Sequence, residues 1–272
     1  GNVHDYFGGR DDLTAGRVRF VGDADTRVQE DYLRILRFFR FFAWYGEGRP
    51  DEAALSACAD GRVGLQRLSA ERIRVEMLKL LSAPRPLQAI QAMFDIGVLA
   101  ELLGQAASPN GLAKLLPIEP EADPLLRLAA LSPGDTDHMT SIAECLRLSN
   151  AERRRLTDLA SPLDDLDETP AIALHRIGRD LYRQRVLLAA AIDGSPYEER
   201  MAAADGWTPQ SFPIAGRDLL ALGLPKGPGV GELLSALEAW WIAGGFRAQK
   251  ADILAEAKAR IGHQAAAKGD DP

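Results

Sequence analysis

The segment that most constrains the fold is RVQEDYLRILRFFRFFAWYG, which runs from Arg27 to Gly46. Its apolar side chains leave almost no polar face, which predicts a helix over 30–45 that is buried nearly all round. Guanidinium groups are rarely buried without a partner. Arg34, Arg37 and Arg40 must therefore meet groups that compensate their charge.

The sequence beyond Gly22 follows the helical period, so we expect an all-α fold. Helices with start signals are expected over 70–82, 151–160 and 170–178, and a further helix is expected over 86–96. Residues 1–22 differ, because β-type side chains flank the turn GGRDDLTAG and predict a two-strand hairpin. An isolated hairpin is marginal in water, so we expect a remnant of a larger sheet. A start at Gly1 without Met suggests a piece of a longer protein.

The composition limits the class of protein. No run of about 18 uncharged apolar residues occurs, so no membrane span and no membrane partner are predicted, and the N-terminus lacks a secretory signal pattern. Cys58 and Cys145 form no metal spacing or disulfide framework, which favours a cytoplasmic location. The net charge of −7 argues against nucleic acid as a partner, but residues 27–85 carry 11 basic and 8 acidic side chains, which allows a local basic surface.

Glu30, Asp31, Arg34 and Arg37 form the most informative charged cluster. On one helix, Glu30, Arg34 and Arg37 share a face and Asp31 lies at its edge. One interpretation is that acids at a helix start pair with arginines three and four residues later. The other is a clamp that reads a base, in which a carboxylate accepts from an exocyclic amine and a guanidinium donates to the neighbouring ring nitrogen. Such a clamp accepts adenine and cytosine and rejects guanine and uracil.

Three motifs in order resemble those of class II tRNA nucleotidyltransferases and bacterial poly(A) polymerases. They are GNVHDYFGGRDDLTAGRVRFVGDADTRVQEDYLRILRFFRF at the N-terminus, LSAERIRVEMLKLL at Leu68–Leu81, and FPIAGRDLLALGLPKGPGVGELLSALEAWWIAGG at Phe212–Gly245. The resemblance implies a β-hairpin remnant of the catalytic head over 1–27, neck helices for base recognition over 28–88, an RNA-binding helical body over 89–195 and an RNA-binding tail over 196–272. Residues 86–211 match only weakly.

The same resemblance implies roles for residues near the first motif. Asp31 and Arg34 would read the base of ATP or CTP, with Glu30 orienting Arg34, while Arg37 and Arg27 would contact phosphate or the active-site loop. The family's Mg²⁺ would be held by carboxylates of the head, so no catalytic residue and no metal ligand is expected in this chain, which would be inactive alone. Asp23–Asp25 and Asp135–Asp137 spell D-x-D, but both are expected in turns or loops.

Two further groups are candidate contacts to RNA. Gly227 and Gly229, beside Lys226, precede a predicted helix and could offer backbone N–H groups to phosphates, although a tight link between helices explains them equally well. Arg176, Arg179 and Arg183 could form a basic helix face, although a solvated surface is the commoner meaning.

The sequence therefore favours the nucleotide-selecting and RNA-binding portion of an enzyme that adds C and A to the 3′ ends of tRNA or another RNA. The alternatives are the same portion of a poly(A) polymerase, a stand-alone helical RNA-binding module, or a purely structural helical protein. The sequence does not predict an oligomeric state.

Overall fold

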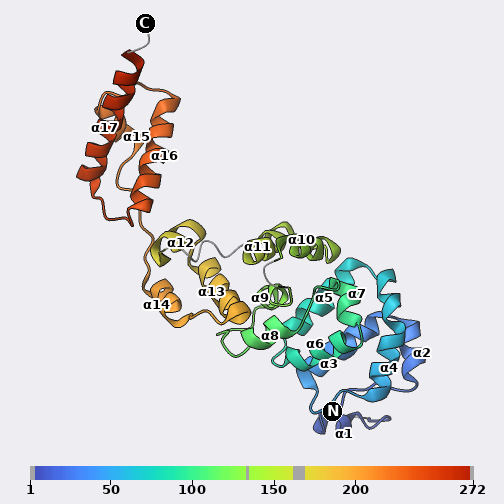
Figure 1. Ribbon diagram of the computed structural model, residues 1–272. Helices are drawn as coiled ribbons and strands as arrows, with labels where there is room; N and C mark the ends of the chain where they lie inside the picture. The colour runs from blue at the N-terminus through green and yellow to red at the C-terminus, as the bar shows by residue number, and fades with distance from the viewer. Residues whose placement is uncertain (1–3, 133–134, 162–168, 270–272) are drawn as a thin grey trace. The chain divides into compact units, whose positions relative to one another are not determined.

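The computed structural model describes residues 4–132, 135–161 and 169–269, which are mainly helical (Figure 1). These residues form seventeen α-helices and one 3₁₀ helix, and no strand occurs among them. The predicted all-α fold is confirmed. Within the described residues, no helix is both long and apolar enough to span a membrane.

The chain divides into two compact units. Unit 1 comprises Gly1–Leu163 with Arg183–Tyr197, and unit 2 comprises Asp164–Tyr182 with Glu198–Pro272. The helices that lie wholly in unit 1 are α1 (Gly9–Thr14), α2 (Ala24–Glu30), α3 (Leu33–Tyr45), α4 (Glu52–Gly61), η1 (Arg62–Arg67), α5 (Ala70–Leu81), α6 (Pro86–Asp95), α7 (Val98–Leu103), α8 (Asn110–Leu115), α9 (Pro124–Ala129), α10 (Thr136–Cys145) and α11 (Asn150–Ala160). Those wholly in unit 2 are α12 (Pro170–Ile177), α14 (Glu198–Gly206), α15 (Gly216–Ala221), α16 (Pro228–Ala243) and α17 (Lys250–Gly269). The division falls within α13 (Arg179–Asp193).

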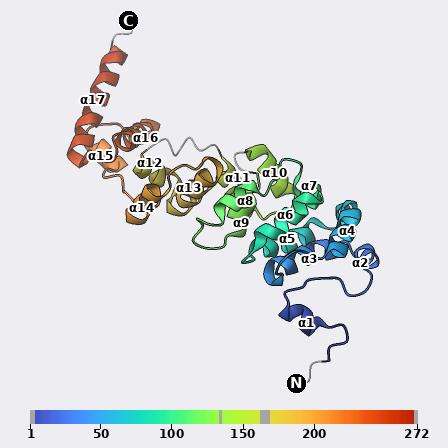
Figure 2. The same cartoon turned by 60° about the horizontal axis from the view of Figure 1, so that its bottom comes forward.

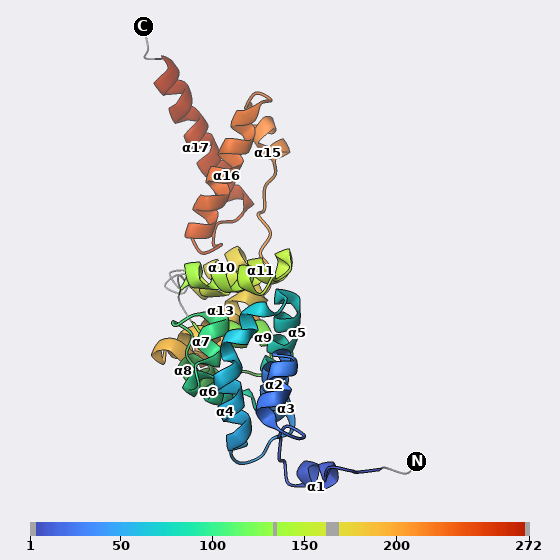
Figure 3. The ribbon, with the colours of Figure 1, turned by 90° about the vertical axis from the view of Figure 1, so that its right-hand side faces the viewer.

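Helix α3 is central to the core of unit 1. It packs against α5 and α6, and it also contacts α2 and α4, which lie beside it in Figure 3. Ile35, Leu36 and Phe39 are completely buried, as are Met77 on α5 and Ile90 on α6. Each such side chain stabilises the fold by about 1.5–3 kcal/mol relative to an exposed one. The aromatic run of the first motif is therefore a core helix.

The helix expected over 30–45 is interrupted at its start. Helix α2 ends at Glu30, Asp31 is extended with φ −157°, and α3 begins at Leu33. Asp31 causes the break, because its carboxylate accepts a hydrogen bond from the Leu33 backbone N–H at 3.1 Å and so replaces a helical partner. The expectation of burial nearly all round was also wrong, because Phe41, Trp44 and Tyr45 remain 41%, 39% and 52% exposed.

The predicted N-terminal hairpin is not formed by the described residues. Helix α1 stands where its turn was expected, and Figure 2 shows α1 at the N-terminal edge of unit 1. The Asp5 carboxylate accepts from the backbone N–H groups of Gly9 at 2.8 Å and Arg10 at 2.9 Å, which satisfies donors at the helix start. Asp12 then accepts from Arg17 and Arg19, at 3.0 and 2.7 Å. With no neighbouring strand among the described residues to pair with, these local bonds decide the conformation.

Unit 2 has a separate small core formed by α15, α16 and α17, which pack together. Trp241 is 3% exposed at its centre, with Phe212 and Phe246 against its ring at centroid distances of 5.4 and 4.9 Å. Its indole N–H donates to the Ala248 carbonyl oxygen at 3.1 Å, so the buried polar atom is satisfied.

Candidate functional site

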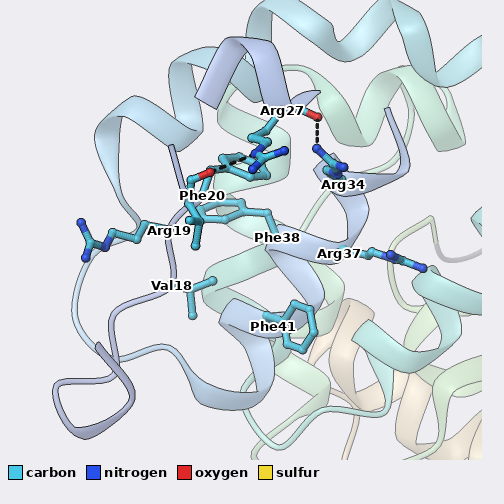
Figure 4. Close-up of a pocket in the computed structure, with 9 residues that line it drawn as sticks. Val18, Arg19, Phe20, Arg27, Arg34, Arg37, Phe38 and Phe41 are labelled. Atoms are coloured by element: carbon cyan, nitrogen blue, oxygen red, sulfur yellow. Dashed lines mark hydrogen bonds between the residues drawn. The ribbon is translucent and has the colours of Figure 1, made fainter. Parts of the chain in front are cut away.

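Three predicted nucleotide contacts line one pocket of unit 1. Arg27 from α2, and Arg34 and Arg37 from α3, surround a hollow of about 410 Å³ (Figure 4). The opposite wall is the irregular segment 18–21 that precedes α2. The side chains of the three arginines are 42%, 34% and 50% exposed, so their charges are accessible from solvent.

The remaining surface of this arginine pocket is largely apolar and aromatic. Phe20 and Phe38 stack with ring centroids 5.6 Å apart, and Phe41 and Val18 extend the apolar wall (Figure 4). Arg19 also lines the pocket, but its side chain extends away from the other arginines. Aromatic faces and guanidinium groups together suit a ligand that carries both a flat ring and negative charge.

Glu30 orients two of the arginines. Its carboxylate accepts from Arg27 at 3.0 Å and from Arg34 through a second short bond. Arg34 also donates to the Arg27 carbonyl oxygen at 2.9 Å, and Arg27 donates to the Val21 carbonyl oxygen at 3.0 Å (Figure 4). The bonds from Arg34 and Arg27 hold the pKa of Glu30 below its usual value, so it stays charged at neutral pH. The helix-start interpretation and the base-clamp interpretation both include the Glu30–Arg34 pair, so this pair alone does not distinguish between them.

Asp31 does not line the pocket, because it points toward α5. One carboxylate oxygen accepts from Arg72 at 2.8 Å, and the other accepts from the Leu33 backbone N–H at 3.1 Å. Partial burial raises the pKa of Asp31. The hydrogen bonds from Leu33 and Arg72, together with the positive charges of Arg72 and Arg37, lower the pKa by more than burial raises it. The net pKa is therefore below the usual value, and the carboxylate is ionised at neutral pH.

Glu76 on α5 is a partner that the sequence interpretation missed. Its carboxylate, 8% exposed, accepts from Arg40 at 2.6 Å and lies 3.5 Å from the Nε atom of Arg37. Arg40 also lies over the Phe41 ring at 4.1 Å. One sequence signal could have pointed to Glu76. The helical period of the second motif places Arg72 and Glu76 four residues apart on one face of the helix.

The basic candidates near α12 do not form one helix face. Arg176 lies in the last turn of α12, whereas Arg179 begins α13 and Arg183 follows on it. Gly178 separates the helices with φ +80°, a backbone conformation that favours glycine. Arg179 donates to the Trp207 carbonyl oxygen. The expected basic helix face is thus divided between two helices, and the contact of these arginines with RNA stays a prediction.

The glycine cluster of the third motif does begin a helix. Gly227 is the residue before α16, and Pro228 is the first helical residue. Lys226, Gly227 and Gly229 are exposed. Because proline has no backbone N–H, the first turn offers one donor fewer than expected.

The two D-x-D triplets serve as helix caps. Asp23 accepts from the Thr26 backbone N–H at 2.8 Å, and Asp135 accepts from the His138 backbone N–H at 2.8 Å. Among the described residues, no group of three or more His, Cys, Asp or Glu side chains is placed to hold a metal ion. The described residues therefore do not fit the Mg²⁺ that the sequence resemblance implies.

Comparisons of sequence place this chain among known proteins. Residues 50–108 match the family described as "Probable RNA and SrmB- binding site of polymerase A". The chain is 30% identical over 281 residues to CCA tRNA nucleotidyltransferase 1, mitochondrial, of Mus musculus, covering 95% of this chain and 62% of that protein. It is 30% identical over 248 residues to the CCA-adding enzyme of Lactobacillus gasseri, covering 88% of this chain and 62% of that protein. The chain thus spans less than two thirds of these relatives.

Comparisons with solved structures also find CCA-adding enzymes. The Bacillus stearothermophilus CCA-adding enzyme in complex with CTP matches with a TM-score of 0.73 and 23% identity, over 96% of this chain and 69% of that one. The Thermotoga maritima CCA-adding enzyme complexed with tRNA matches with a TM-score of 0.65 and 19% identity, over 94% and 67%. A CCA-adding enzyme in complex with ATP matches with a TM-score of 0.68 and 20% identity, over 94% and 66%. At these identities the likeness shows a shared fold.

Proposed function

Because this chain is related in sequence and fold to CCA-adding enzymes, we propose that it selects the nucleotide and holds the RNA in a template-independent nucleotidyltransferase. The whole protein would add CMP and AMP to tRNA 3′ ends. The observation that carries the proposal is the convergence of Arg27, Arg34 and Arg37 on one pocket, with Glu30 bonded to two of them.

The chemistry of a base edge explains how such a site selects. Adenine and cytosine each present an amine donor beside a ring nitrogen that accepts. The Arg34 guanidinium lines the pocket and can only donate, whereas the ionised Asp31, whose carboxylate is bonded to Arg72 on α5, can only accept and would have to turn toward the pocket to meet the base amine. Guanine and uracil present a carbonyl and a ring N–H in those places, which would leave both protein groups unpaired. A site with fixed polar groups rejects the wrong partner because unpaired groups lose their hydration.

The pocket also suits the rest of a nucleotide. Arg37, half exposed at its outer face, can contact phosphate while its Nε side faces Glu76. Phe20, which stacks on the buried Phe38, provides an apolar wall. The relatives solved with CTP and with ATP support these nucleotides as ligands. In this proposal, Mg²⁺ would be held by residues outside this chain.

RNA binding is assigned to the helices that follow. The family match over residues 50–108 covers α4 to α7, and its description names RNA. Arg176, Arg179, Arg183 and the exposed start of α16 are proposed further contacts. The same description names polymerase A, so addition of a poly(A) tail is the second candidate activity. The cytoplasmic location stays a prediction, since one relative is named mitochondrial.

Equilibrium binding of the four nucleoside triphosphates to the 272-residue chain tests the proposal. We expect ATP and CTP to bind about tenfold or more tightly than GTP and UTP, which is the scale of one unpaired polar contact. Asp31→Ala should remove that difference. Asp60→Ala, an exposed carboxylate on α4, should retain it. Equal binding of all four by the wild-type chain, or no binding at millimolar nucleotide, would contradict nucleotide selection by this chain.

A further inference from the structure

A second hollow of unit 1 lies apart from the arginine pocket and is called here the α6 hollow. It has a volume of about 640 Å³, and its wall is formed by residues 47–48 and 84–88 together with Leu116, Glu119 and Arg127. Residues 84–88 end the link from α5 and begin α6, while Arg127 belongs to α9, which packs against α5 and α8. The α6 hollow shares no lining residue with the arginine pocket.

A buried ion pair in the wall of the α6 hollow leaves one acceptor unused. The side chains of Glu119 and Arg127 are each 5% exposed. Arg127 donates from Nε to Oε1 of Glu119 at 2.8 Å, and from a second guanidinium nitrogen to the same oxygen. The other oxygen of Glu119, Oε2, is buried and accepts no hydrogen bond from any described residue. Buried polar atoms nearly always have a partner, so Oε2 is an acceptor that a ligand can satisfy.

The start of α6 brings donors to the same hollow. Arg85 precedes the helix, Pro86 is its first residue, and no side chain caps this end. The backbone N–H groups of Leu87 and Gln88, which both line the hollow, therefore have no partner within the helix. Uncapped helix starts attract anions, phosphate above all. The Arg85 side chain is 53% exposed and 3.8 Å from the Glu47 carboxylate at the surface, so it keeps donors for a ligand.

We propose that the α6 hollow binds a ribonucleotide, with its phosphate at the start of α6 and a ribose hydroxyl donating to Glu119. The ligand must carry an anion for the donors of α6 and Arg85. It must also carry a neutral donor for Oε2, because Arg127 already compensates the charge of Glu119. A ribonucleotide holds both groups a few bonds apart, and the volume of the hollow is within the usual range of small-ligand sites.

The ribonucleotide is either one residue of a bound RNA or a free nucleotide, since both present the same phosphate and the same hydroxyl. A ribose hydroxyl is also the group by which a protein distinguishes RNA from DNA. The inference does not rest on base selection in the arginine pocket, because the two sites use different residues.

Backbone amide NMR of the 272-residue chain tests the site, because the signals of Leu87 and Gln88 report on the start of α6 itself. The chain is titrated with AMP, with 2′,3′-dideoxy-AMP, which lacks both ribose hydroxyls, and with inorganic phosphate. We expect AMP to shift both signals and to bind about tenfold more tightly than the dideoxy analogue or phosphate, the scale of one hydrogen bond to a charged group. Changing the ligand leaves the buried Glu119–Arg127 pair intact.

Arg85→Gln tests the phosphate contact at an exposed position that the fold does not depend on. We expect it to weaken AMP binding by about threefold to tenfold. Arg49→Gln is the matched control, because Arg49 is an exposed arginine close to residues 47–48 that does not line the α6 hollow. This control should bind AMP with the wild-type affinity.

A single-stranded oligoadenylate RNA distinguishes the two sources of the ligand. If it shifts the Leu87 and Gln88 signals at lower concentration than AMP, the ligand is a residue of RNA, and if AMP binds more tightly, the ligand is a free nucleotide. Equal affinity for AMP and its dideoxy analogue overturns the contact with Glu119 and with it the ribonucleotide. No shift of these signals with millimolar AMP or with the RNA overturns the site, as does a folded Arg85→Gln variant that binds AMP like the wild type.

Discussion

At the scale of single residues, the three arginines of α3 differ in what compensates their charge. Arg34 meets Glu30 and the Arg27 carbonyl oxygen, and Arg37 and Arg40 share the carboxylate of Glu76. Arg40 is the most enclosed of the three, with a side chain 19% exposed. Arg34 and Arg37 keep donors facing the pocket, whereas Arg40 is held within the α3–α5 contact.

Glu76 should therefore matter for stability. We expect Glu76→Gln to lower the free energy of unfolding by about 1–3 kcal/mol, because it removes the counter-charge of Arg40 from a buried position. Chemical denaturation of the wild-type chain and of Glu76→Gln measures this difference in stability. Glu71→Gln is the matched control on α5, since Glu71 pairs with Arg147 at the surface and both side chains are more than half exposed. Equal losses of unfolding free energy in the two variants would show that the burial of Glu76 does not increase its contribution to stability.

Sequence reasoning identified the pocket arginines but not their partners on α5. Arg27, Arg34 and Arg37 were predicted, and the structure brings them together. Arg72 and Glu76 were missed because they lie 41 and 36 residues from the groups they bind. The helical period places Arg72 and Glu76 on one face of α5, but it does not show which distant residues that face contacts.

At the scale of the elements, local signals predicted the helices whose ends are fixed by nearby residues. Helices α5 and α6 begin at Ala70 and Pro86, as expected, and α11 begins with a complete capping box formed by Ser149 and Glu152. The break between α2 and α3 was not predicted. It depends on tertiary packing as well as on Asp31, because the Tyr32 ring occupies the space beside Gly64 of η1.

Gly64 should accept no larger residue. A Cβ atom added there would lie 2.2 Å from the Tyr32 ring, closer than real Cβ contacts, so the ring or η1 must move. We expect Gly64→Ala to lower the free energy of unfolding by about 1–3 kcal/mol. Thermal unfolding, monitored by circular dichroism, measures this change in stability. Gly9→Ala is the control, since its nearest atom would be at an ordinary 3.6 Å. A Gly64→Ala variant as stable as the control would show that Tyr32 is not held against η1.

At the scale of the whole molecule, the sequence predicted the all-α fold class and pointed to the relatives that the comparisons find. Three motifs resembled those of such enzymes, and the alignment with the Mus musculus relative covers 95% of this chain. The unit boundary inside α13 has no local signal, because it is set by which distant segments pack together. Arg127 illustrates the same limit, since this buried arginine of α9 donates to the carbonyl oxygens of Leu81, the last residue of α5, and of Ala83 beyond it.

The most direct test of base selection compares ATP with inosine triphosphate, which differs from ATP by a carbonyl in place of the amine and a proton on the adjoining ring nitrogen. Their dissociation constants are measured on the wild-type chain and on Asp31→Ala. We expect inosine triphosphate to bind the wild-type chain about tenfold or more weakly than ATP, and the two to bind Asp31→Ala alike. Equal affinity of the wild-type chain for both would show that no group in this chain reads the base edge.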